Sequence, residues 1–551
     1  MKKHILLFFT FTIIFAQYDI IIRNGHIYNG SGDAPFQGDI AIEGDRIVKI
    51  APKIQGNGKS EIDANGLAVS PGFINMLSWA TTSLIADGRS LSDIKQGVTL
   101  EVFGEGWSMG PLNEKMRDQQ LAEMTEFKYE VDWTTLGEYL ESLENRGIST
   151  NVASFVGATT LRIHEIGFED RPPTKGELEN MKSLVGQAME EGALGVGSSL
   201  IYAPAFYSST EELIELCKIV SEYNGMYISH IRSESNRFLE SLDELITISE
   251  KANIPAEIYH LKAGGVPNHY KMDLAIEKIN EARERGLKIT TDMYLYVAGA
   301  TGLDAHMPPW VQEGGYDKWA ERLQDPEIRK RVKQEMIADT DDWENLGLLA
   351  GPEGILFSGF KNPDLRQYIG KTLKEVADEL GQHYADVAMD FVIQDGSRVD
   401  VVYFLMSEEN IKKQIQLPYM SFGSDAGSIA PEGEFLNYNP HPRAYGNFSR
   451  LLGKYVREEK VISLENAIQK LTGLSAEKLK IKNRGYLKKG YYADVVIFDP
   501  EKIQDHATFA KPHQLSTGVH HVFVNGSHVL KNGEHTGETP GRVVRGPGYK
   551  K

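Results

Sequence analysis

The chain has 551 residues, of which 41% are hydrophobic and 25% charged, so it can bury a large core and should hold one big domain with a smaller companion. The formal net charge of -18 and the pI of about 5.4 argue against a nucleic-acid partner, because proteins that bind the phosphate backbone need a basic surface. Cys217 is the only cysteine, so no intramolecular disulfide can form.

The first sixteen residues have the order of a secretory signal peptide. Lys2 and Lys3 precede an apolar run at 5–15, which ends before the small residue Ala16. This run is too short to span ~30 Å of hydrocarbon at ~1.5 Å per residue, so we expect cleavage near Gln17 rather than a membrane anchor. We find no later segment apolar enough to cross a bilayer, and we expect an exported, soluble mature chain, periplasmic or secreted.

Both ends of the remaining chain have β-hairpin patterns. Between residues 18 and 69, short apolar runs alternate with turn pairs such as Asn24-Gly25 and Asn29-Gly30. The same alternation of apolar runs and turn pairs occurs at 493–498 and 522–533. We therefore predict a small β-sandwich domain that residues 17–70 and 480–551 build together.

The middle of the chain has the pattern of an α/β protein. Short β-branched runs alternate with amphipathic helical stretches, as in parallel βαβ units. The predicted strands lie at 72–76, 98–103, 150–156, 194–199, 226–231, 256–261, 289–296 and 419–425. Eight such strands predict a TIM barrel over residues 71–479. The last gap is too long for a simple connection and contains helical stretches, so we expect an inserted lid or subdomain at about 304–400.

Three polar residues stand at the ends of predicted strands, where TIM barrels carry their chemistry. His230 and His260 end neighbouring strands and offer the imidazole nitrogens that suit zinc. Asp425 ends the last strand and could complete the site or accept a proton. One isolated histidine would more often be a hydrogen-bonded barrel residue, but three polar residues at matching strand ends predict a catalytic site.

Short motifs recur in order along the chain. They are Ser-Pro-Gly-Phe-Ile-Asn at 70–75, Gly-Val-Thr at 97–99, Ser-His-Ile-Arg at 229–232, His-Leu-Lys at 260–262, Gly-Ser-Asp at 423–425, His-Pro-Arg-Ala-Tyr-Gly at 441–446, Gly-Tyr-Tyr-Ala-Asp at 490–494 and Val-Asn-Gly at 524–526. Each is weak alone, but in this order and spacing the chain resembles the N-acyl-D-amino-acid deacylases, or D-aminoacylases, of the amidohydrolase superfamily. The resemblance covers nearly the whole mature chain.

The resemblance implies an amidohydrolase-type barrel that hydrolyses the amide bond of N-acyl (D-)amino acids with a zinc-activated water. His230 and His260 would be zinc ligands, and Asp425 would be the general base that delivers a proton to the leaving amine. The partner would be a small-molecule substrate with a free carboxylate. The sequence carries no signal of an oligomeric state.

The resemblance also implies substrate-binding residues. Arg443, in the His-Pro-Arg motif, would hold the substrate carboxylate, for which a planar guanidinium is well suited. Lys262 and one of Tyr294 or Tyr296 fall where the family places further substrate contacts. A solvated surface role is the alternative for Arg443 and Lys262.

The chain also departs from the family pattern. Superfamily members usually carry His-x-His after the first strand, where this chain has Leu77 and Trp79, so we expect the second metal position to be absent. A further family histidine, expected after the third strand, is Ala158 here, so substrate polarisation must come from elsewhere or be lost.

Glu105 offers a replacement for another missing ligand. D-aminoacylases place a cysteine after the second strand, and with a one-residue deletion in the local alignment Glu105 takes its place in Gly104-Glu-Gly106. Zinc accepts carboxylate oxygen as well as imidazole nitrogen. We therefore predict one zinc ion per chain, bound by Glu105, His230 and His260.

Two alternatives stay open. The enzyme could hydrolyse a cyclic amide, as in the dihydroorotase and hydantoinase branches, or the barrel could be a non-catalytic binding protein that has lost part of its metal site. The missing His-x-His pair favours the second, and the retained Gly-Ser-Asp motif argues against it.

Overall fold

A parallel barrel lies at the centre of the computed structural model, which describes residues 17–124 and 127–550; the predicted signal peptide lies outside them. Its strands run in two sheets, in the orders β6-β7-β8 and β9-β10-β11-β12-β13-β17. They are β6 (Phe73–Asn75), β7 (Val98–Phe103), β8 (Asn151–Ser154), β9 (Val156–Gly157), β10 (Gly195–Ser199), β11 (Met226–His230), β12 (Ala256–Ile258), β13 (Ile289–Met293) and β17 (Met420–Phe422). The backbone N–H of Met76 donates to the carbonyl of Phe422 at 3.1 Å and joins the first strand to the last. The predicted TIM barrel is confirmed.

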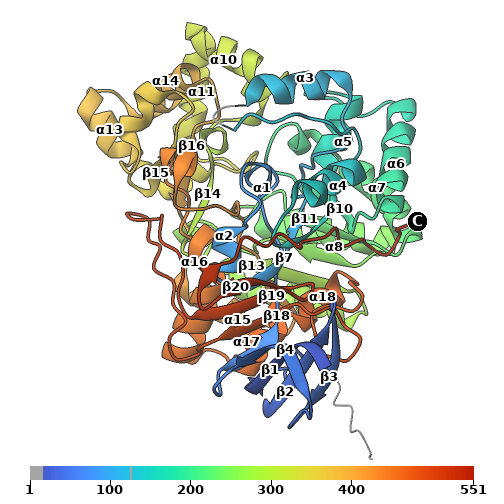
Figure 1. Cartoon of the computed structure of the whole chain (residues 1–551). Helices are drawn as coiled ribbons and strands as arrows, with labels where there is room; N and C mark the ends of the chain where they lie inside the picture. The colour runs from blue at the N-terminus through green and yellow to red at the C-terminus, as the bar shows by residue number, and fades with distance from the viewer. Residues whose placement is uncertain (1–16, 125–126, 551) are drawn as a thin grey trace, which may run out of the picture.

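Helices cover the outside of the barrel (Figure 1). The main ones are α4 (Leu136–Arg146), α6 (Lys175–Glu190), α7 (Thr210–Glu222), α8 (Phe238–Ala252), α9 (Lys271–Glu284), α15 (Glu408–Ile415) and α17 (Leu464–Leu471). Shorter helices are α1 (Ser83–Ala86), α2 (Leu91–Ile94), α3 (Glu114–Glu123), α5 (Ala158–Glu165), α16 (Arg443–Arg450) and α18 (Gly473–Lys478). In α8 the buried residues Leu242, Leu245 and Ile246 recur at helical spacing, so one face packs against the strands.

The two ends of the chain build one sheet, as predicted. Its order is β21-β20-β19-β18-β5-β1-β2-β3, with β4 paired to β1. The strands are β1 (Gln17–Ile27), β2 (Phe36–Glu43), β3 (Arg46–Ala51), β4 (Asn57–Asp63), β5 (Ala68–Pro71), β18 (Val495–Phe498), β19 (Val519–Val524), β20 (Ser527–Lys531) and β21 (Glu534–His535). Figure 1 shows the blue N-terminal strands beside the red C-terminal ones below the barrel. The antiparallel pairing of β5 with β18 joins the two halves.

The final residues leave this sheet and run along the barrel. The carbonyl of Arg542 accepts from Val152 in β8 at 3.0 Å, and Val544 donates back to Val152 at 2.8 Å. Lys550 donates to the carbonyl of Glu190 at the end of α6. This arrangement differs from the expectation that residues 480–551 belong to the terminal domain as a whole, because the tail gains backbone partners at the barrel edge.

The insertion is a unit with its own core. It contains the antiparallel strands β14 (Ala298–Gly302), β15 (Ile355–Gly359) and β16 (Asp400–Phe404), in the order β14-β16-β15. Its helices are α10 (Tyr316–Gln324), α11 (Pro326–Ile337), α12 (Leu346–Ala350), α13 (Leu373–Leu380) and α14 (Tyr384–Asp395). Apolar side chains such as Trp319, Phe357 and Phe391 fill the space between them. The small sheet was not predicted, since its strands are short and far apart in sequence.

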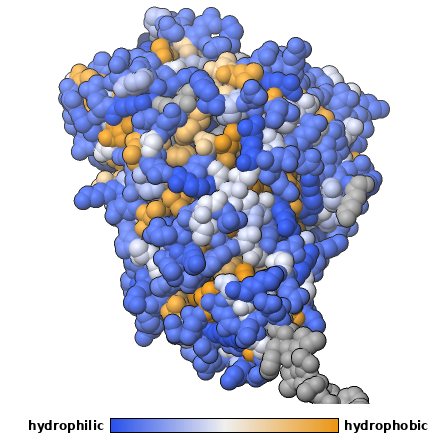
Figure 2. All heavy atoms as spheres, in the orientation of Figure 1, coloured by the Kyte–Doolittle hydropathy of each residue, from blue (hydrophilic) through white to orange (hydrophobic). Residues whose placement is uncertain are grey.

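The face drawn in Figure 2 is largely hydrophilic, and apolar atoms show in small groups, most of them where the inserted unit lies. Within residues 17–124 and 127–550, no helix has the length and apolar character that a membrane span requires.

The terminal sheet and the barrel share a core, which a phenylalanine in β18 tests. Phe498 is fully buried, and its ring meets that of Phe73 edge-to-face at 6.1 Å. We expect Phe498→Ala to lower the free energy of unfolding by about 3–5 kcal/mol through lost burial and a cavity. Phe36→Ala, in the same sheet but at a side chain that is 42% exposed, should cost about 0.5 kcal/mol. Denaturant unfolding measures both, and equal small losses would contradict the shared core.

Candidate metal centre and active site

A cavity of about 280 Å³ opens at the carboxyl ends of the barrel strands. The barrel supplies one side of it, and Thr301, Glu344 and Arg398 from the inserted unit supply the other. Enzymes with this fold place their chemistry at this end of the barrel. The cavity therefore unites the strand-end residues with the inserted unit.

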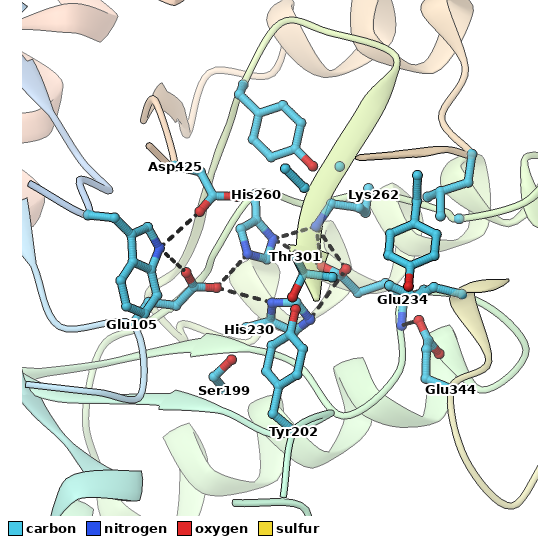
Figure 3. A pocket seen from close by; sticks show the side chains of 18 of the residues that line it. Glu105, Ser199, Tyr202, His230, Glu234, His260, Lys262, Thr301, Glu344 and Asp425 are labelled. Atoms are coloured by element: carbon cyan, nitrogen blue, oxygen red, sulfur yellow. Dashed lines mark hydrogen bonds and ion pairs between the residues drawn. The ribbon is translucent and has the colours of Figure 1, made fainter. Parts of the chain in front are cut away.

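Three predicted metal ligands meet at the floor of this cavity (Figure 3). Oε1 of Glu105 lies 3.1 Å from Nδ1 of His230 and 2.7 Å from Nε2 of His260. One potential ligand atom from each residue lies within 4.8 Å of the others, and all three side chains are buried. The structure thus brings together the three residues predicted from the sequence.

Glycines aim Glu105 into the cavity. Gly104 has φ +107° and Gly106 has φ +73°, a backbone region that L side chains rarely adopt. A Cβ on Gly104 would stand 2.4 Å from the carbonyl oxygen of Phe155, and one on Gly106 would stand 2.7 Å from Cβ of Ser199. Both positions therefore require glycine, and the sharp turn between them directs the carboxylate of Glu105 inward.

Two of the predicted site residues have unusual backbone angles. His260 has φ +33° and Asp425 has φ +49°, each just beyond the end of its strand. Hydrogen bonds hold both: Asp292 Oδ1 accepts from the backbone N–H of His260, and the carbonyl of Leu77 accepts from that of Asp425. Strain of this kind persists where the surrounding structure enforces it, often at functional sites. Here it turns both side chains from the strand direction into the cavity.

Glu234 was missed by the sequence analysis. Its Oε1 lies 3.0 Å from Nδ1 of His260, and its Oε2 lies 3.4 Å from Nε2 of His230. A carboxylate at the outer nitrogen fixes the orientation and proton position of an imidazole that binds a metal through the other nitrogen. Burial opposes the ionisation of Glu234, but the positive side chains of His230, Lys262 and His260 outweigh it and lower its pKa to about 2. The only sequence signal was its position four residues after His230.

Lys262 is paired with a buried carboxylate. It lines the cavity, but its ammonium group is bound by both oxygens of Glu234, at 2.7 and 2.8 Å. A buried ammonium needs such a partner, and Glu234 holds the pKa of Lys262 above its ordinary value against the effect of burial. Lys262 therefore supports Glu234 at the cavity wall, and its contact with a substrate stays a prediction.

The two predicted tyrosines are separated by the fold. Tyr294 lines the cavity and lies beneath the guanidinium of Arg443, at 4.3 Å from the ring centre. Tyr296 is directed elsewhere and donates to Asp505 Oδ2 at 3.2 Å, outside the residues that line the cavity. The expected substrate contact therefore falls to Tyr294.

Arg443 and Asp425 form a buried pair beside the metal-ligand candidates. Nη1 of Arg443 lies 2.7 Å from Oδ2 of Asp425, close enough for an ion pair but poorly aligned for a hydrogen bond. Burial raises the pKa of Asp425, Arg443 opposes the rise, and the negative charge of Glu105 adds to it. A carboxylate with a raised pKa holds a proton more readily, which suits a group that must accept one and pass it on.

The three-residue cluster fits zinc. Two imidazoles and a carboxylate form a mixed nitrogen and oxygen set, and three protein ligands with one open position are a common catalytic arrangement. Burial opposes the charge on Glu105, but His260 and His230 overcome it and hold the pKa of Glu105 below its ordinary range, so the carboxylate is ionised. Nδ1 of His230 is the nitrogen that faces Glu105, at 3.1 Å, while its Nε2 lies 3.4 Å from Oε2 of Glu234.

Sequence comparisons give a consistent picture. The model of the Amidohydrolase family matches residues 419–530. A D-aminoacylase from Alcaligenes xylosoxydans xylosoxydans is 31% identical over 531 residues, which cover 96% of this chain and 97% of the relative. An N-acyl-D-aspartate deacylase from the same organism is 31% identical over 537 residues, or 96% of this chain and 95% of the relative.

Solved structures agree with the sequence relatives. The crystal structure of a D-aminoacylase has a TM-score of 0.77 and 29% identity and covers 96% of this chain and 100% of its own. An N-acyl-D-glutamate deacylase from Bordetella bronchiseptica, in complex with zinc and a phosphonate inhibitor, has a TM-score of 0.78 and 25% identity over the same shares. An L-hydantoinase from Arthrobacter aurescens, at 14% identity and a TM-score of 0.55 over 96% of this chain and 100% of its own, shares the fold alone.

A closed parallel barrel with histidines and carboxylates gathered at its strand ends defines the protein as an amidohydrolase. Within that class, the similarity over nearly the whole length decides the family. The chain belongs to the family of D-aminoacylase and the N-acyl-D-amino-acid deacylases, as the order of its motifs predicted.

Glu344 provides a test of the electrostatics at the cavity wall. Its carboxylate accepts from the hydroxyls of Ser233 and Ser235 and from the backbone N–H of Glu234, which ties the inserted unit to the loop after β11. Burial raises its pKa to about 7, Ser233 opposes the rise, and the charge of Glu234 adds to it. The protonated form is therefore favoured by folding.

We expect this group to make stability depend on pH. Its stabilising contribution is complete below the unfolded pKa near 4.5 and is lost as the pH rises through about 7. Glu344→Gln does not titrate, so its free energy of unfolding relative to the native chain should rise between pH 5 and pH 8 by on the order of 3 kcal/mol. Thermal or denaturant unfolding at both pH values measures this, and a pH-independent offset would contradict the raised pKa.

Proposed function

We propose that the protein hydrolyses the amide bond of N-acyl D-amino acids and uses one zinc ion per chain. The observation that carries the proposal is the convergence of Glu105, His230 and His260 beside Asp425, in a cavity that also holds Arg443. The names of the relatives support the substrate class, since they act on acylated D-amino acids. The apolar run that precedes Ala16 supports export to the periplasm or the medium.

Glu105, His230 and His260 would hold the zinc ion. When bound, zinc supplies a Lewis acid for the amide carbonyl and lowers the pKa of a bound water from about 15.7 toward ~7. Glu234 keeps the outer nitrogen of His260 engaged, so that Nε2 faces the centre. The buried side chains exclude bulk water from this side of the cavity, which strengthens every electrostatic contact within it.

Asp425 would accept and then donate the proton that the reaction transfers. Its carboxylate lies at the cavity edge of the ligand cluster, and burial raises its pKa, so it can accept a proton from the attacking water. The same group then delivers that proton to the leaving amine, which must be protonated before it departs. No other carboxylate among the described cavity-lining residues combines this position with a raised pKa next to the cluster, since Glu344 is engaged by Ser233 and Ser235.

Arg443 would bind the free carboxylate of the substrate. The side chain is buried, lines the cavity, and its Nε has no hydrogen-bond partner within residues 17–124 and 127–550. Leaving such a donor unpaired in a buried site is costly, and a carboxylate in the cavity would satisfy it. The position of Arg443 beside Asp425 would set the carboxylate of the substrate close to the proton acceptor.

The remaining alternatives have weaker support. The likeness to the hydantoinase extends to the fold and not to the level of sequence identity seen with the deacylases, so it does not favour a cyclic amide. A non-catalytic barrel has no need for the strained Asp425 or for the support that Glu234 gives to His260.

Metal analysis tests the proposed centre. We expect close to one equivalent of zinc per chain and hydrolysis of N-acetyl-D-amino acids that a chelator abolishes. Glu105→Gln should lower zinc affinity and abolish turnover while the fold survives, and its thermal unfolding should become insensitive to chelator, because stabilisation linked to the ligand is lost. Glu344→Gln changes a carboxylate of the same cavity wall and should retain its zinc.

Two results would contradict this centre. Native protein without zinc after mild purification would remove the proposed function. A Glu105→Gln variant with full zinc content and normal turnover would show that Glu105 is not a ligand.

The role of Arg443 predicts a change in substrate preference. We expect Arg443→Ala to lose about 1.5–3 kcal/mol of binding to free acids, as a missing charge-assisted hydrogen bond implies. The ratio of kcat/KM for an N-acetyl-D-amino acid over its amide should fall about 10–100-fold, since each ~1.4 kcal/mol is tenfold. This ratio cancels any effect of the substitution on Asp425, because Asp425 would act on the acid and the amide in the same way.

Arg443→Lys is the matched control. It keeps a positive charge beside Asp425 but loses the planar pair of donors, so the ratio should fall less than in Arg443→Ala. Equal losses on acid and amide in both variants would refute the assigned role.

A further inference from the structure

Trp79 stands between two of the carboxylates that line the cavity, Glu105 and Asp425. Its indole Nε1 lies 2.9 Å from Oε2 of Glu105 and 3.1 Å from Oδ1 of Asp425. Both contacts appear as dashed lines that meet at one indole nitrogen in Figure 3. The side chain lines the cavity and is 37% exposed, so it lies at the boundary between the ligand cluster and the space for a substrate. No sequence pattern predicted the contact of the Trp79 indole with the two carboxylates.

The backbone around Trp79 holds the indole in this position. Its N–H donates to the carbonyl of Ala426 at 2.9 Å, and the N–H of Ser78 donates to Val102 at 2.8 Å. The hydroxyl of Ser78 donates to the buried Glu101 at 2.7 Å. The segment after β6 is thus fixed between β7 and the loop after β17, and the direction of the indole follows from it.

The remaining oxygens of the two carboxylates are already engaged. Oε1 of Glu105 faces His230 and His260, and Oδ2 of Asp425 faces Arg443. The indole N–H is therefore the group that stands between the two anions on their shared side. Like charges in a buried site repel, and a donor or a cation between them relieves that repulsion. The indole of Trp79 relieves this repulsion with a neutral N–H donor, and its ring fills the space that a cation would occupy.

We propose that Trp79 is a positioning residue that takes the place of a second cation. Its N–H holds the carboxylates of Glu105 and Asp425 in fixed positions, and its ring excludes another metal ion from the space between them. The centre is thereby restricted to one metal ion. This inference rests on the proposed function, because it concerns the occupancy and geometry of that same site.

Trp79→Phe removes the N–H and reduces the bulk while it keeps an apolar ring. The two carboxylates then face each other without a donor, so we expect the variant to take up a second equivalent of zinc when it is equilibrated with excess metal, desalted and analysed for metal. Trp79→His is the second variant, and its imidazole should favour the second ion further. Trp107→Phe is the matched control: Trp107 lines the same cavity, whereas the indole hydrogen bonds to the two carboxylates come from Trp79, and one equivalent is expected.

Kinetics give an independent measurement. A proton acceptor that loses its fixed position lowers kcat, whereas binding through Arg443 is untouched. We therefore expect Trp79→Phe in the one-metal state to lower kcat about tenfold or more with KM nearly unchanged. Circular dichroism shows whether each variant is folded.

The outcomes separate the inference from the proposed function. If Trp79→Phe and Trp79→His both bind one equivalent in excess zinc, or if Trp107→Phe binds two, the inference is overturned and the hydrolase remains. If the native chain binds two equivalents, the inference and the proposed stoichiometry of one zinc per chain both fail, while amide hydrolysis remains. If the native chain binds no zinc at all, the proposed function fails first.

Discussion

The contact of one buried carboxylate with two imidazoles is the constraint on which the rest of the site depends. Glu105 is charged in an environment that disfavours charge, and His230, His260 and the indole N–H of Trp79 make that state tolerable. Each histidine stands at the end of a buried parallel strand, so the barrel sets the separation of their rings. Glycines on both sides of Glu105 allow the close approach. The backbone of the strands and of the glycine-flanked turn thus sets the geometry of the proposed metal site.

A second layer of polar residues keeps this cluster in order. Glu234 joins His260 to Lys262, Asp292 accepts from the backbone of His260, and Glu344 carries the connection into the inserted unit. Each of these groups is buried and would be costly without its partners. The insertion therefore forms part of the support of the centre as well as a wall of the cavity. Changes in its strands and helices would reach the metal ligands through only a few hydrogen bonds.

The barrel and the two histidines at strand ends could be predicted because strand periodicity and a polar residue at the end of a run are local signals. Glu105 could be proposed as a ligand only through the family resemblance, because no local pattern marks it as one. Glu234, the carboxylate contacts of Trp79 and the partner of Lys262 could not be recognised, because they depend on loop directions that only the closed barrel defines. The sequence also could not decide between Tyr294 and Tyr296, because Asp505, the hydrogen-bond partner of Tyr296, lies far along the chain.

The pairing of β5 with β18 also governs the order in which this chain can fold. Ser70 meets Val496, so the first strands cannot complete their sheet until nearly all of the polypeptide has been synthesised. Contacts between such distant residues form slowly, and exposed strand edges invite wrong partners in the meantime. The C-terminal tail also donates and accepts backbone hydrogen bonds at Val152 and Glu190, so this edge of the barrel lacks partners until the end of the chain has been made. The N-terminal strands can pair with one another early, but the edge of β5 that β18 covers lacks its partner until nearly the whole chain has been made.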